Sequence, residues 1–278
     1  MNDWLKTKVK DFRYSDQTLV MGILNVTPDS FSDGGSYHTI DQAIAQAKKM
    51  EEQGAHLIDV GGESTRPGHK PVSEQEELNR VVPVVEAIAQ EITIPISVDT
   101  YKSKVAKAAV QAGASIINDV WGAKKEPEIA KVAAEYQAPI ILMHNREDRH
   151  YQSLMNDVLS DLEESIQIAL ARGVKEENII LDPGIGFAKS FEENMQVMRE
   201  LERIKTLGYP VLLGTSRKSM IGHALNLPVG QRDEGTGATV CYGITKGVEI
   251  VRVHNVEMIA RMTSMMDQMI GKGSEIDG

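Results

Sequence analysis

Eight short apolar segments, most of them followed by a helical pattern, constrain the fold of this chain more than any other feature of its sequence. The segments are rich in Ile, Leu and Val, and the intervening stretches repeat apolar residues at the three- and four-residue spacing of a helix. The segments are 19–25, 56–60, 95–99, 115–118, 139–143, 178–182, 210–213 and 249–253. Continuously apolar strands that alternate with helices are typical of a parallel sheet covered by helices.

Eight strand–helix units in 278 residues predict an α/β fold of the TIM (β/α)8 barrel type, formed by a single domain. We expect this domain to span residues 18–271, between a short, peripheral N-terminal extension of residues 1–17 and a C-terminal tail of residues 272–278. A doubly wound sheet is the alternative, because it uses the same units without closing them. The first strand is not followed by G-x-G-x-x-G, which disfavours this alternative.

Local signals indicate where the expected helices begin and end. Thr39-x-x-Gln42 and Ser73-x-x-Glu76 have the pattern of a capping box, which starts a helix. Glycines that commonly end helices stand just before later strands, at Gly54, Gly113, Gly173, Gly208 and Gly247.

The composition excludes several classes of function. A net charge of −10 argues against nucleic acid as a partner, although local positive charge can still bind a small anion. No apolar run approaches the roughly 20 residues of a membrane span, and residues 1–10 lack the apolar core of a secretory signal. We therefore expect no membrane association and a cytoplasmic protein. The single cysteine, Cys241, excludes an intrachain disulfide, and its helical flanks predict a buried, structural thiol.

Polar side chains stand at the end of almost every expected strand. They include Asn25, Thr65, Arg66, Asp99, Asn118, Asp119, His144, Asp182, Lys218, Arg252 and His254. Because the carboxyl ends of the strands meet at one mouth of a barrel, these side chains should share a pocket. Each alone has a structural explanation, such as a helix cap at Asp99 or a turn at Asp182, and we interpret Asp119 in that way. Their joint occurrence at one end favours a binding site.

The residue types predict the chemistry of the ligand. Asp99, Asn118 and Asp182 offer acceptors and an amide to a flat heterocycle with N–H and NH₂ edges. Positive charge for phosphate or carboxylate comes from Arg66, Arg217, Lys218, Arg252 and His254. Most of it follows the seventh and eighth strands, where barrels often bind phosphate. The sequence therefore predicts a polar heterocycle that carries phosphate.

The sequence contains no zinc-binding H-E-x-x-H motif and no G-x-S-x-G nucleophile motif. If the site binds a metal, its ligands should be oxygens such as that of Asn25, together with substrate phosphate. Ligands of this kind favour magnesium.

Two long motifs at these positions resemble the signatures of the dihydropteroate synthase family, the folate-pathway enzymes that sulfonamides block. They are Gly22-Ile-Leu-Asn-Val-Thr-Pro-Asp-Ser-Phe-Ser-Asp-Gly-Gly35 and Gly61-Gly-Glu-Ser-Thr-Arg-Pro-Gly68. Shorter matches follow in order: Ser97-Val-Asp-Thr100, Ile117-Asn-Asp119, Leu181-Asp-Pro-Gly-Ile-Gly-Phe187, Gly214-Thr-Ser-Arg-Lys-Ser219 and Val251-Arg-Val-His254. The loop His144-Asn-Arg-Glu-Asp-Arg lacks the Gly-Pro stretch common in the family, and we assign no role to it.

The resemblance implies a transferase that condenses para-aminobenzoate with 7,8-dihydropterin-6-ylmethyl diphosphate, giving 7,8-dihydropteroate and diphosphate. At the matching positions it implies pterin contacts by Asp99, Asn118, Met143, Asp182, Phe187 and Lys218. It implies that Asn25, Arg252 and His254 hold the diphosphate with magnesium. It further implies that Asp33, Thr65 and Arg66 lie on two loops that close over the leaving group, and that Ser219 faces the aminobenzoate carboxylate. The residues expected to act in catalysis are Asp99, Asp182, Lys218, Arg252 and His254.

A stripe of methionines near the end of the chain predicts helix packing, either in the core or against a partner. It consists of Met258, Met262, Met265, Met266 and Met269. The resemblance implies a homodimer through this region.

Two other functions remain open. A methyltetrahydrofolate-dependent methyltransferase would share the pterin pocket, and a non-catalytic pterin-binding module would bind without turnover. The diphosphate residues are all present, which disfavours both alternatives. A barrel aldolase is disfavoured because none of the expected strands carries a lysine for a Schiff base.

Overall fold

The computed structural model of the chain describes residues 3–26, 36–63 and 71–273, with the side chains of residues 36–39 left out of the description. The strands are β1 (Trp4–Leu5), β2 (Phe12–Arg13), β3 (Leu19–Asn25), β4 (Leu57–Gly61), β5 (Ile96–Asp99), β6 (Ile116–Asp119), β7 (Ile140–Met143), β8 (Ile179–Asp182), β9 (Leu212–Leu213) and β10 (Ile250–Val253). The helices are α1 (Ser36–Glu52), α2 (Glu74–Ala89), α3 (Ser103–Ala112), α4 (Glu128–Tyr136), α5 (Leu154–Ala171), α6 (Phe191–Arg199), α7 (Glu202–Lys205), α8 (Ser219–Leu225), α9 (Asp233–Thr245) and α10 (Val256–Ile270).

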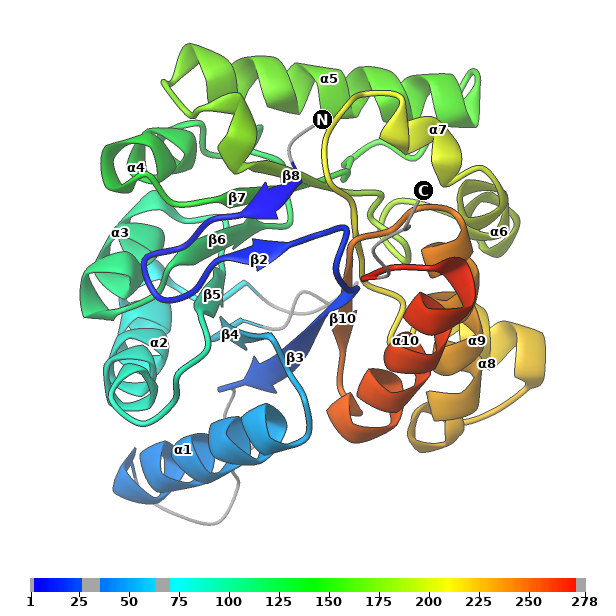
Figure 1. The fold of residues 1–278 in the computed structure, drawn as a ribbon. Coiled ribbons are helices and arrows are strands. Elements are labelled where there is room, and N and C mark those ends of the chain that lie inside the picture. The colour runs from blue at the N-terminus through cyan, green and yellow to red at the C-terminus, as the bar shows by residue number, and fades with distance from the viewer. Residues whose placement is uncertain (1–2, 27–35, 64–70, 274–278) are drawn as a thin grey trace.

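Strands β3 to β10 form one parallel sheet that curls into a barrel, with the helices around its outside (Figure 1). The strand order is β8-β7-β6-β5-β4-β3-β10-β9, and a parallel bridge between Leu181 and Val211 joins the two outermost strands. The TIM barrel predicted from the sequence is confirmed, and the doubly wound alternative is wrong. The predicted segments agree with the observed strands to within one or two residues. β9 is the shortest strand of the barrel, and just before it the carbonyl of Pro210 accepts from the Leu181 N–H at 2.9 Å.

The register of the sheet brings the polar ends of the first four barrel strands to the same level. Asn25 lies opposite Gly61, Gly61 opposite Asp99, and Asp99 opposite Asn118. Side chains alternate between the two faces of a strand, so residues two apart in one strand point the same way. The side chains of Asp99 and Asn118 are therefore presented together at the carboxyl end of the barrel.

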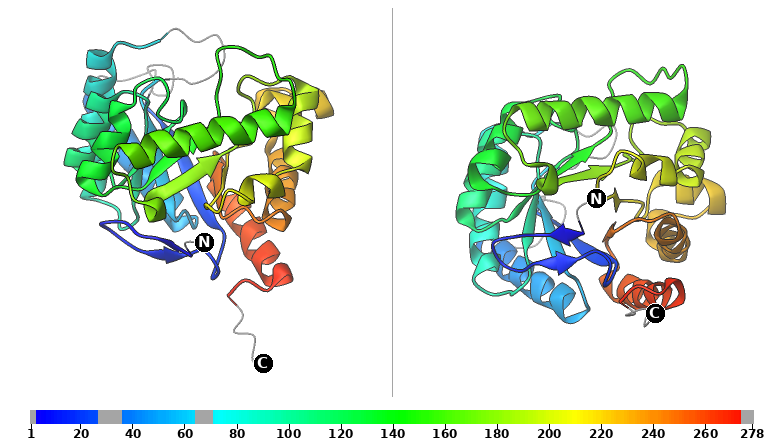
Figure 2. Two further views of the ribbon diagram at one scale, coloured as in Figure 1. Left: turned by 90° about the horizontal axis from the view of Figure 1, so that it is seen from above. Right: turned by 45° about the horizontal axis from the view of Figure 1, so that its top comes forward.

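The other end of the barrel is filled by an apolar layer that the N-terminal residues cover. The layer consists of Leu19, Met21, Leu57, Ile116, Ile141, Ile180, Leu212 and Ile250. The antiparallel hairpin β1–β2 lies across this end (Figure 2) and adds Leu5, Phe12 and Tyr14 to the same core. The expectation of a peripheral extension over residues 1–17 is therefore wrong, because three of its side chains are at most 4% exposed.

The helix signals are confirmed in part. The Ser73 hydroxyl accepts from the Glu76 N–H at the start of α2, and the glycines that precede the strands adopt positive φ angles, from 88° to 125°. The capping box predicted at Thr39 is wrong, because α1 already begins at Ser36. A reciprocal capping box occurs instead between Ser190 and Glu193, at the start of α6, where the sequence reading did not predict one.

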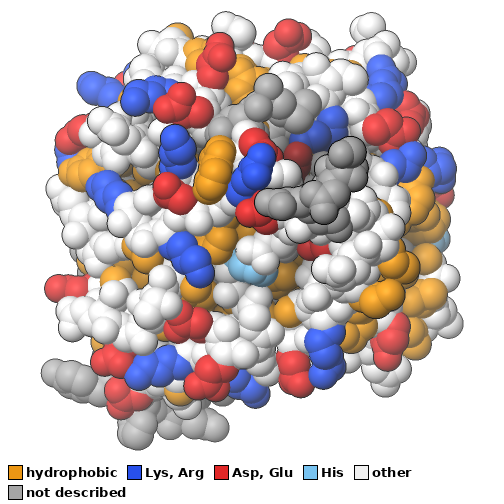
Figure 3. Space-filling model, viewed as in Figure 1, with side chains coloured by type: hydrophobic (Ala, Val, Ile, Leu, Met, Phe, Trp, Pro, Cys, Tyr) orange, Lys and Arg blue, Asp and Glu red, His pale blue; other side chains and the backbone are white. Residues whose placement is uncertain are grey.

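Several expectations drawn from composition can be tested against the fold. Cys241 lies on α9 and is half-buried rather than buried, and burial raises the pKa of its thiol. In the part of the chain that the structure describes, no helix is both long and apolar enough to cross a membrane. The methionine stripe lies on α10, where Met262 and Met266 pack against the core while Met265 and Met269 are exposed. Figure 3 shows apolar side chains gathered over the α8–α10 side of the molecule.

Candidate active site

Arg252 lies at the centre of a buried polar cluster formed by residues of four different strands. From β10, its Nε donates to Asp59 Oδ2 on β4 at 2.6 Å, and its Nη2 donates to Asp99 Oδ2 on β5 at 2.8 Å. Asn118 on β6 donates from its Nδ2 to the same Asp59 oxygen at 3.0 Å. The strand ends therefore converge as the sequence predicted, and two carboxylates hold the guanidinium inside the barrel.

Three oxygen atoms of this cluster are buried without a hydrogen-bond partner in the described part of the chain. They are Asp59 Oδ1, Ser97 Oγ and Asp99 Oδ1. Asp59 and Ser97 lie opposite each other in the register of β4 and β5, and Asp99 lies two residues further along β5. Buried polar atoms without partners are rare because each costs about 1–3 kcal/mol. Atoms of this kind at the mouth of a barrel are suited to a ligand or ordered water that supplies hydrogen-bond donors.

Burial raises the pKa values of the two carboxyl groups expected to bind the pterin. The pKa of Asp99 rises to about 7 because the group is buried, although the Arg252 charge opposes the rise. Burial also raises the pKa of Asp182, at the end of β8, against the N–H of Gly184, which donates to Asp182 Oδ1 at 2.7 Å. Both carboxyl groups therefore gain from a ligand that brings N–H donors or positive charge.

Lys218 and Phe187 form a second part of the site. The Lys218 ammonium lies 4.1 Å from the centre of the Phe187 ring, which is the geometry of a cation–π contact. A side chain at Gly186 would collide with Lys218, because a Cβ atom there would lie 2.8 Å from Lys218 Cδ. The segment after β8 and the residue before α8 thus pack directly against each other.

The positively charged residues near the seventh and eighth strands have different partners in the structure. His254 follows β10, and its Nδ1 is 2.9 Å from the hydroxyl of Ser216, which also accepts the His254 N–H. Arg217 is held by Asp233 through two hydrogen bonds of 2.7 and 2.9 Å. Arg217, predicted to be one of the charges for a phosphate, instead forms an ion pair in the structure.

The remaining predicted residues are placed as follows. Asn25 is half-buried at the end of β3, and Met143 is buried at the end of β7. Ser219 is exposed at the first residue of α8, directly after Lys218. Asp33, Thr65 and Arg66 lie outside the described residues.

Two charged residues of this region were missed by the sequence reading. Asp59 stands inside the apolar segment Leu57-Ile-Asp-Val60, and a carboxylate on a buried strand was a usable signal because it requires a partner. Lys189 is 8% exposed, and its Nζ lies 2.7 Å from His144 Nδ1. No local sequence motif marks Lys189. It contacts His144, the residue after β7, only because the fold brings the two segments together.

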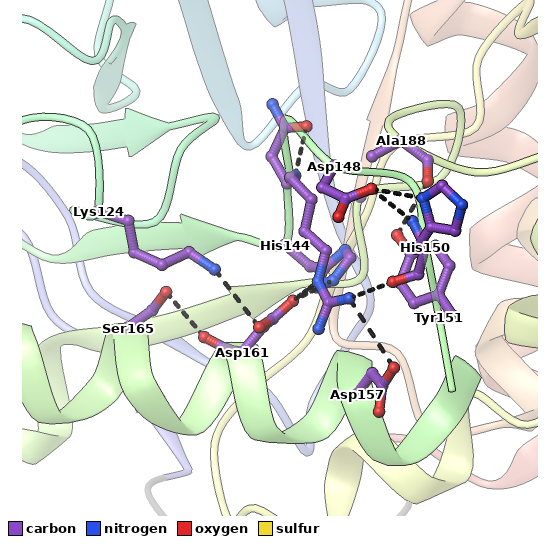
Figure 4. A network of polar contacts seen from close by, with 12 residues as sticks. Lys124, His144, Asp148, His150, Tyr151, Asp157, Asp161, Ser165 and Ala188 are labelled. Atoms are coloured by element: carbon purple, nitrogen blue, oxygen red, sulfur yellow. Dashed lines mark hydrogen bonds and ion pairs between the residues drawn. The ribbon is translucent and has the colours of Figure 1, made fainter. Parts of the chain in front are cut away.

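The segment after β7, to which no role was assigned, forms its own polar network. His144 Nε2 lies 2.9 Å from Asp161 Oδ2 on α5, and Asp161 also pairs with Arg146 (Figure 4). Burial lowers the pKa of His144 to about 4, and the Asp161 hydrogen bond opposes the shift only in part. The imidazole is therefore neutral near pH 7.

Asp119, interpreted as structural, accepts the N–H groups of Trp121 and Ala123 at 2.8 and 2.6 Å. Both of its oxygens are used within the turn after β6. The geometry is that of a turn-forming carboxylate. Asp99 differs, because its Oδ1 has no partner in the part of the chain that the structure describes.

Comparison with known proteins identifies the family. A family profile described as "Pterin binding enzyme" matches residues 21–254, a range that contains all the site residues described above and the whole barrel sheet except the first two residues of β3. The chain is 62% identical to the dihydropteroate synthase of Bacillus subtilis over 97% of this chain and 94% of that protein. The chain belongs to the dihydropteroate synthase family.

Solved structures agree with this assignment. The dihydropteroate synthase of Clostridium difficile, determined in the presence of pteroic acid, superimposes with a TM-score of 0.91 at 50% identity, covering 93% of this chain and 98% of that one. The Xanthomonas albilineans enzyme, determined with 4-aminobenzoic acid, gives 0.92 at 39% identity, covering 97% and 99%. The predicted transferase function in folate biosynthesis, dihydropteroate synthesis, is thereby confirmed.

Proposed function

We propose that this chain condenses para-aminobenzoate with 7,8-dihydropterin-6-ylmethyl diphosphate at the carboxyl end of its barrel, using the residues described above. The observation that carries the proposal is the buried Arg252 cluster, in which Asp99 Oδ1, beside the end of β6, has no partner among the described residues. The proposal concerns the role of each side chain in the reaction of the family.

The pterin ring is the group that this cluster fits. Its N–H and NH₂ edges supply donors to the carboxyl groups of Asp99 and Asp182. Asn118 offers an amide whose Nδ2 already donates to Asp59. Met143 and Phe187 line the ring with apolar surface. Lys218, held over the Phe187 ring, donates to an acceptor on the opposite edge of the heterocycle.

The substitution at the exocyclic methylene develops positive charge on the pterin and negative charge on the departing diphosphate, and both need compensation. The methylene–oxygen bond breaks with its electron pair going to the diphosphate, and the amine of para-aminobenzoate forms the new C–N bond and releases a proton. The carboxylates of Asp99 and Asp182 favour positive charge on the pterin as that bond weakens. No protein nucleophile is needed, because the aromatic amine is itself nucleophilic.

The leaving group is assigned to His254 and Arg252. His254, whose Nδ1 lies 2.9 Å from the Ser216 hydroxyl, is assigned to a diphosphate oxygen. Arg252 uses Nε and Nη2 for Asp59 and Asp99, so Nη1 is the nitrogen available to the substrate. By resemblance to the family we also assign Asp33, Thr65 and Arg66 to the leaving group, and Ser219 to the aminobenzoate carboxylate.

The donor set of this mouth fits magnesium carried by the substrate. Asn25 presents one amide oxygen at the end of β3, and among the described residues no cluster of three or more His, Cys, Asp or Glu side chains could hold a metal alone. Magnesium usually binds through one or two protein oxygens with substrate phosphates and water. Bound in that way, it would offset negative charge on the departing diphosphate.

We further propose that the protein is a cytoplasmic homodimer, as the resemblance implies. The exposed Met265, Met269 and Ile270 on α10 support the dimer, since they place apolar surface on one helix.

A turnover assay tests the proposed function. The purified protein is incubated with the pterin diphosphate, para-aminobenzoate and magnesium, and both diphosphate and dihydropteroate are measured. We expect equimolar products that depend on para-aminobenzoate. Removal of magnesium should weaken binding of the pterin diphosphate far more than binding of the bare pterin. Pterin binding without turnover would instead support the binding module or the methyltransferase.

A further inference from the structure

Lys189 is a buried lysine that the proposed reaction does not use. It stands between β8 and α6 with 8% of its surface exposed. Its ammonium contacts three acceptors: His144 Nδ1 at 2.7 Å, the Gly184 carbonyl at 3.1 Å and the Phe187 carbonyl at 3.2 Å. An ammonium has three N–H donors, so these three contacts match its full capacity.

Two of these acceptors belong to the segment that carries the pterin-binding side chains. Residues 183–188 follow Asp182, the Gly184 N–H donates to the Asp182 carboxylate, and the Phe187 ring contacts the Lys218 ammonium. The segment is tightly bent, with positive φ angles at Gly184, Gly186 and Ala188. A Cβ atom at Gly184 would lie 1.9 Å from the His144 carbonyl, so the segment lies directly against the end of β7.

The third acceptor links the segment to the outer helix layer. Because the ammonium donates to His144 Nδ1, the neutral imidazole carries its proton on Nε2 and donates it to Asp161 on α5. Asp161 is held in turn by Arg146 and lies 3.9 Å from Lys124 (Figure 4). A continuous chain of contacts thus runs from α5 through β7 to the segment after β8.

We propose that Lys189 is a positioning residue for the reaction: it clasps residues 183–188 against His144 and thereby fixes Asp182 and the Phe187–Lys218 pair in the geometry that receives the pterin. Lys189 acts through these groups rather than on the substrate. Burying an ammonium is costly, and burial lowers the pKa of Lys189 to about 7. An apolar side chain of similar length would fill the same space without that cost. The three directed contacts explain why a lysine occupies this site.

The test compares Lys189→Met with a matched variant, Lys205→Met, in the full-length protein. Lys205 on α7 is also a well-covered lysine that binds a backbone carbonyl, that of Tyr209 at 3.3 Å, and pairs with Glu249 at the opposite end of the barrel. Isothermal titration measures the affinity for the bare pterin, and steady-state kinetics give kcat and KM for each substrate. Both are normalised to folded protein.

We expect Lys189→Met to weaken bare-pterin binding about 10-fold and to lower kcat/KM for the pterin diphosphate about 10- to 100-fold, because small misplacements of binding groups have effects of that size. KM for para-aminobenzoate at saturating pterin diphosphate should change less than about 3-fold. Lys205→Met should lower thermal stability with both substrates unaffected. Wild-type pterin affinity and kcat/KM in Lys189→Met would overturn the proposal, even when its stability falls.

A second pair of variants covers the case in which Lys189→Met does not fold. His144→Asn keeps an acceptor near the position of Nδ1, whereas His144→Leu removes it. We expect bare-pterin affinity to fall several-fold in His144→Leu and to stay near wild type in His144→Asn. Equal pterin affinities in the two variants would contradict the proposed positioning role of the Lys189–His144 contact. Because the readout is pterin binding, it is separate from the turnover assay that tests the proposed function.

Discussion

The two ends of the barrel are built from the same strands but treat polar groups in opposite ways. At the hairpin end, an apolar layer is covered by Leu5, Phe12 and Tyr14, and the buried polar groups beside it are paired. Asp267 accepts both the N–H and the hydroxyl of Thr18, each at 2.6 Å. At the carboxyl end, three oxygens of the buried cluster have no partner within the described residues.

A single strand can therefore contribute to stability at one end of the barrel and to ligand binding at the other. β4 contributes Leu57 to the apolar layer and, two residues later, Asp59 to the Arg252 cluster. Satisfied polar groups hold the hairpin end together, whereas unsatisfied ones at the mouth cost stability that a ligand can recover. Substitutions at the two ends should therefore affect different measurements.

The largest effect is expected at the mouth, from Asp182→Ala. Removing this buried carboxylate should weaken binding of the bare pterin by at least about 100-fold, because a buried charge that pairs with the ligand is lost. Burial already raises the pKa of Asp182, so the free energy of unfolding should fall little or rise. Isothermal titration and chemical denaturation give the two quantities.

A matched variant, Asp119→Ala, sharpens this result. Asp119 is also buried, at the end of β6, two strands away from β8, but both its oxygens accept N–H groups of the following turn. We expect its loss to lower the free energy of unfolding by about 2 kcal/mol and to change pterin affinity less than about 3-fold. Unchanged pterin affinity in Asp182→Ala would remove that residue from the site.

The sequence predicts the mouth better than it predicts the hairpin end. Asp99, Asn118 and Asp182 each end an apolar segment, so periodicity alone places them at one edge of a parallel sheet. The hairpin has two-residue strands, Trp4–Leu5 and Phe12–Arg13, which are too short for any periodic signal. Its packing depends on contacts with strands far along the chain, which local propensity does not encode.

Within the site, contacts between residues on different strands are harder to predict from the sequence. Asp59 and Arg252 are 193 positions apart, and only the register of the closed barrel brings them to 2.6 Å. Lys189 and His144 are likewise joined by the fold rather than by a motif. Sequence reasoning could name side chains at strand ends, but not the partners that commit Arg252 and Arg217 to ion pairs.

At the hairpin end, the expected effect of Asp267→Ala is on stability alone. The substitution leaves the Thr18 N–H and hydroxyl without their acceptor, which should lower the free energy of unfolding by about 3 kcal/mol. Denaturant unfolding measures this loss, and kcat/KM per folded molecule should remain within about 2-fold of wild type. Asp267→Asn keeps one acceptor and should lose less.

If kcat/KM of Asp267→Ala fell by more than its unfolded fraction explains, the hairpin end would affect activity as well as stability. The two ends of the barrel would then not be independent. Such a result would mean that the contact between Thr18 and α10 transmits strain along β3 to Asn25. Equal stability losses in Asp267→Ala and Asp267→Asn would show that the carboxylate charge, rather than its two acceptors, stabilises this end.

The smallest effect is a pH dependence that arises at the hairpin end. His56 Nδ1 accepts the Val20 N–H at 3.0 Å, and its ring lies edge-on to Phe12, 5.7 Å away. Burial, with the charge of Lys10, lowers the pKa of His56 from 6.5 to about 4. The unfolded chain therefore binds more protons than the folded one between these pH values. The contribution of His56 to the free energy of unfolding is complete above pH 6.5 and is lost as the pH drops toward 4.

His56→Asn isolates this contribution, because an asparagine oxygen can accept the Val20 N–H near the position of Nδ1 and does not titrate. His144 titrates over the same range, with its pKa also lowered to about 4, and the raised pKa of Asp99 acts in the opposite direction. Both groups are present in wild type and variant, so the difference between the two proteins reports on His56. We expect the loss between pH 6.5 and 4 to shrink by about 2 kcal/mol in the variant. Parallel stability profiles for the two proteins would show that His56 is not held neutral by the hairpin, and that the acid sensitivity of the fold comes from the mouth instead.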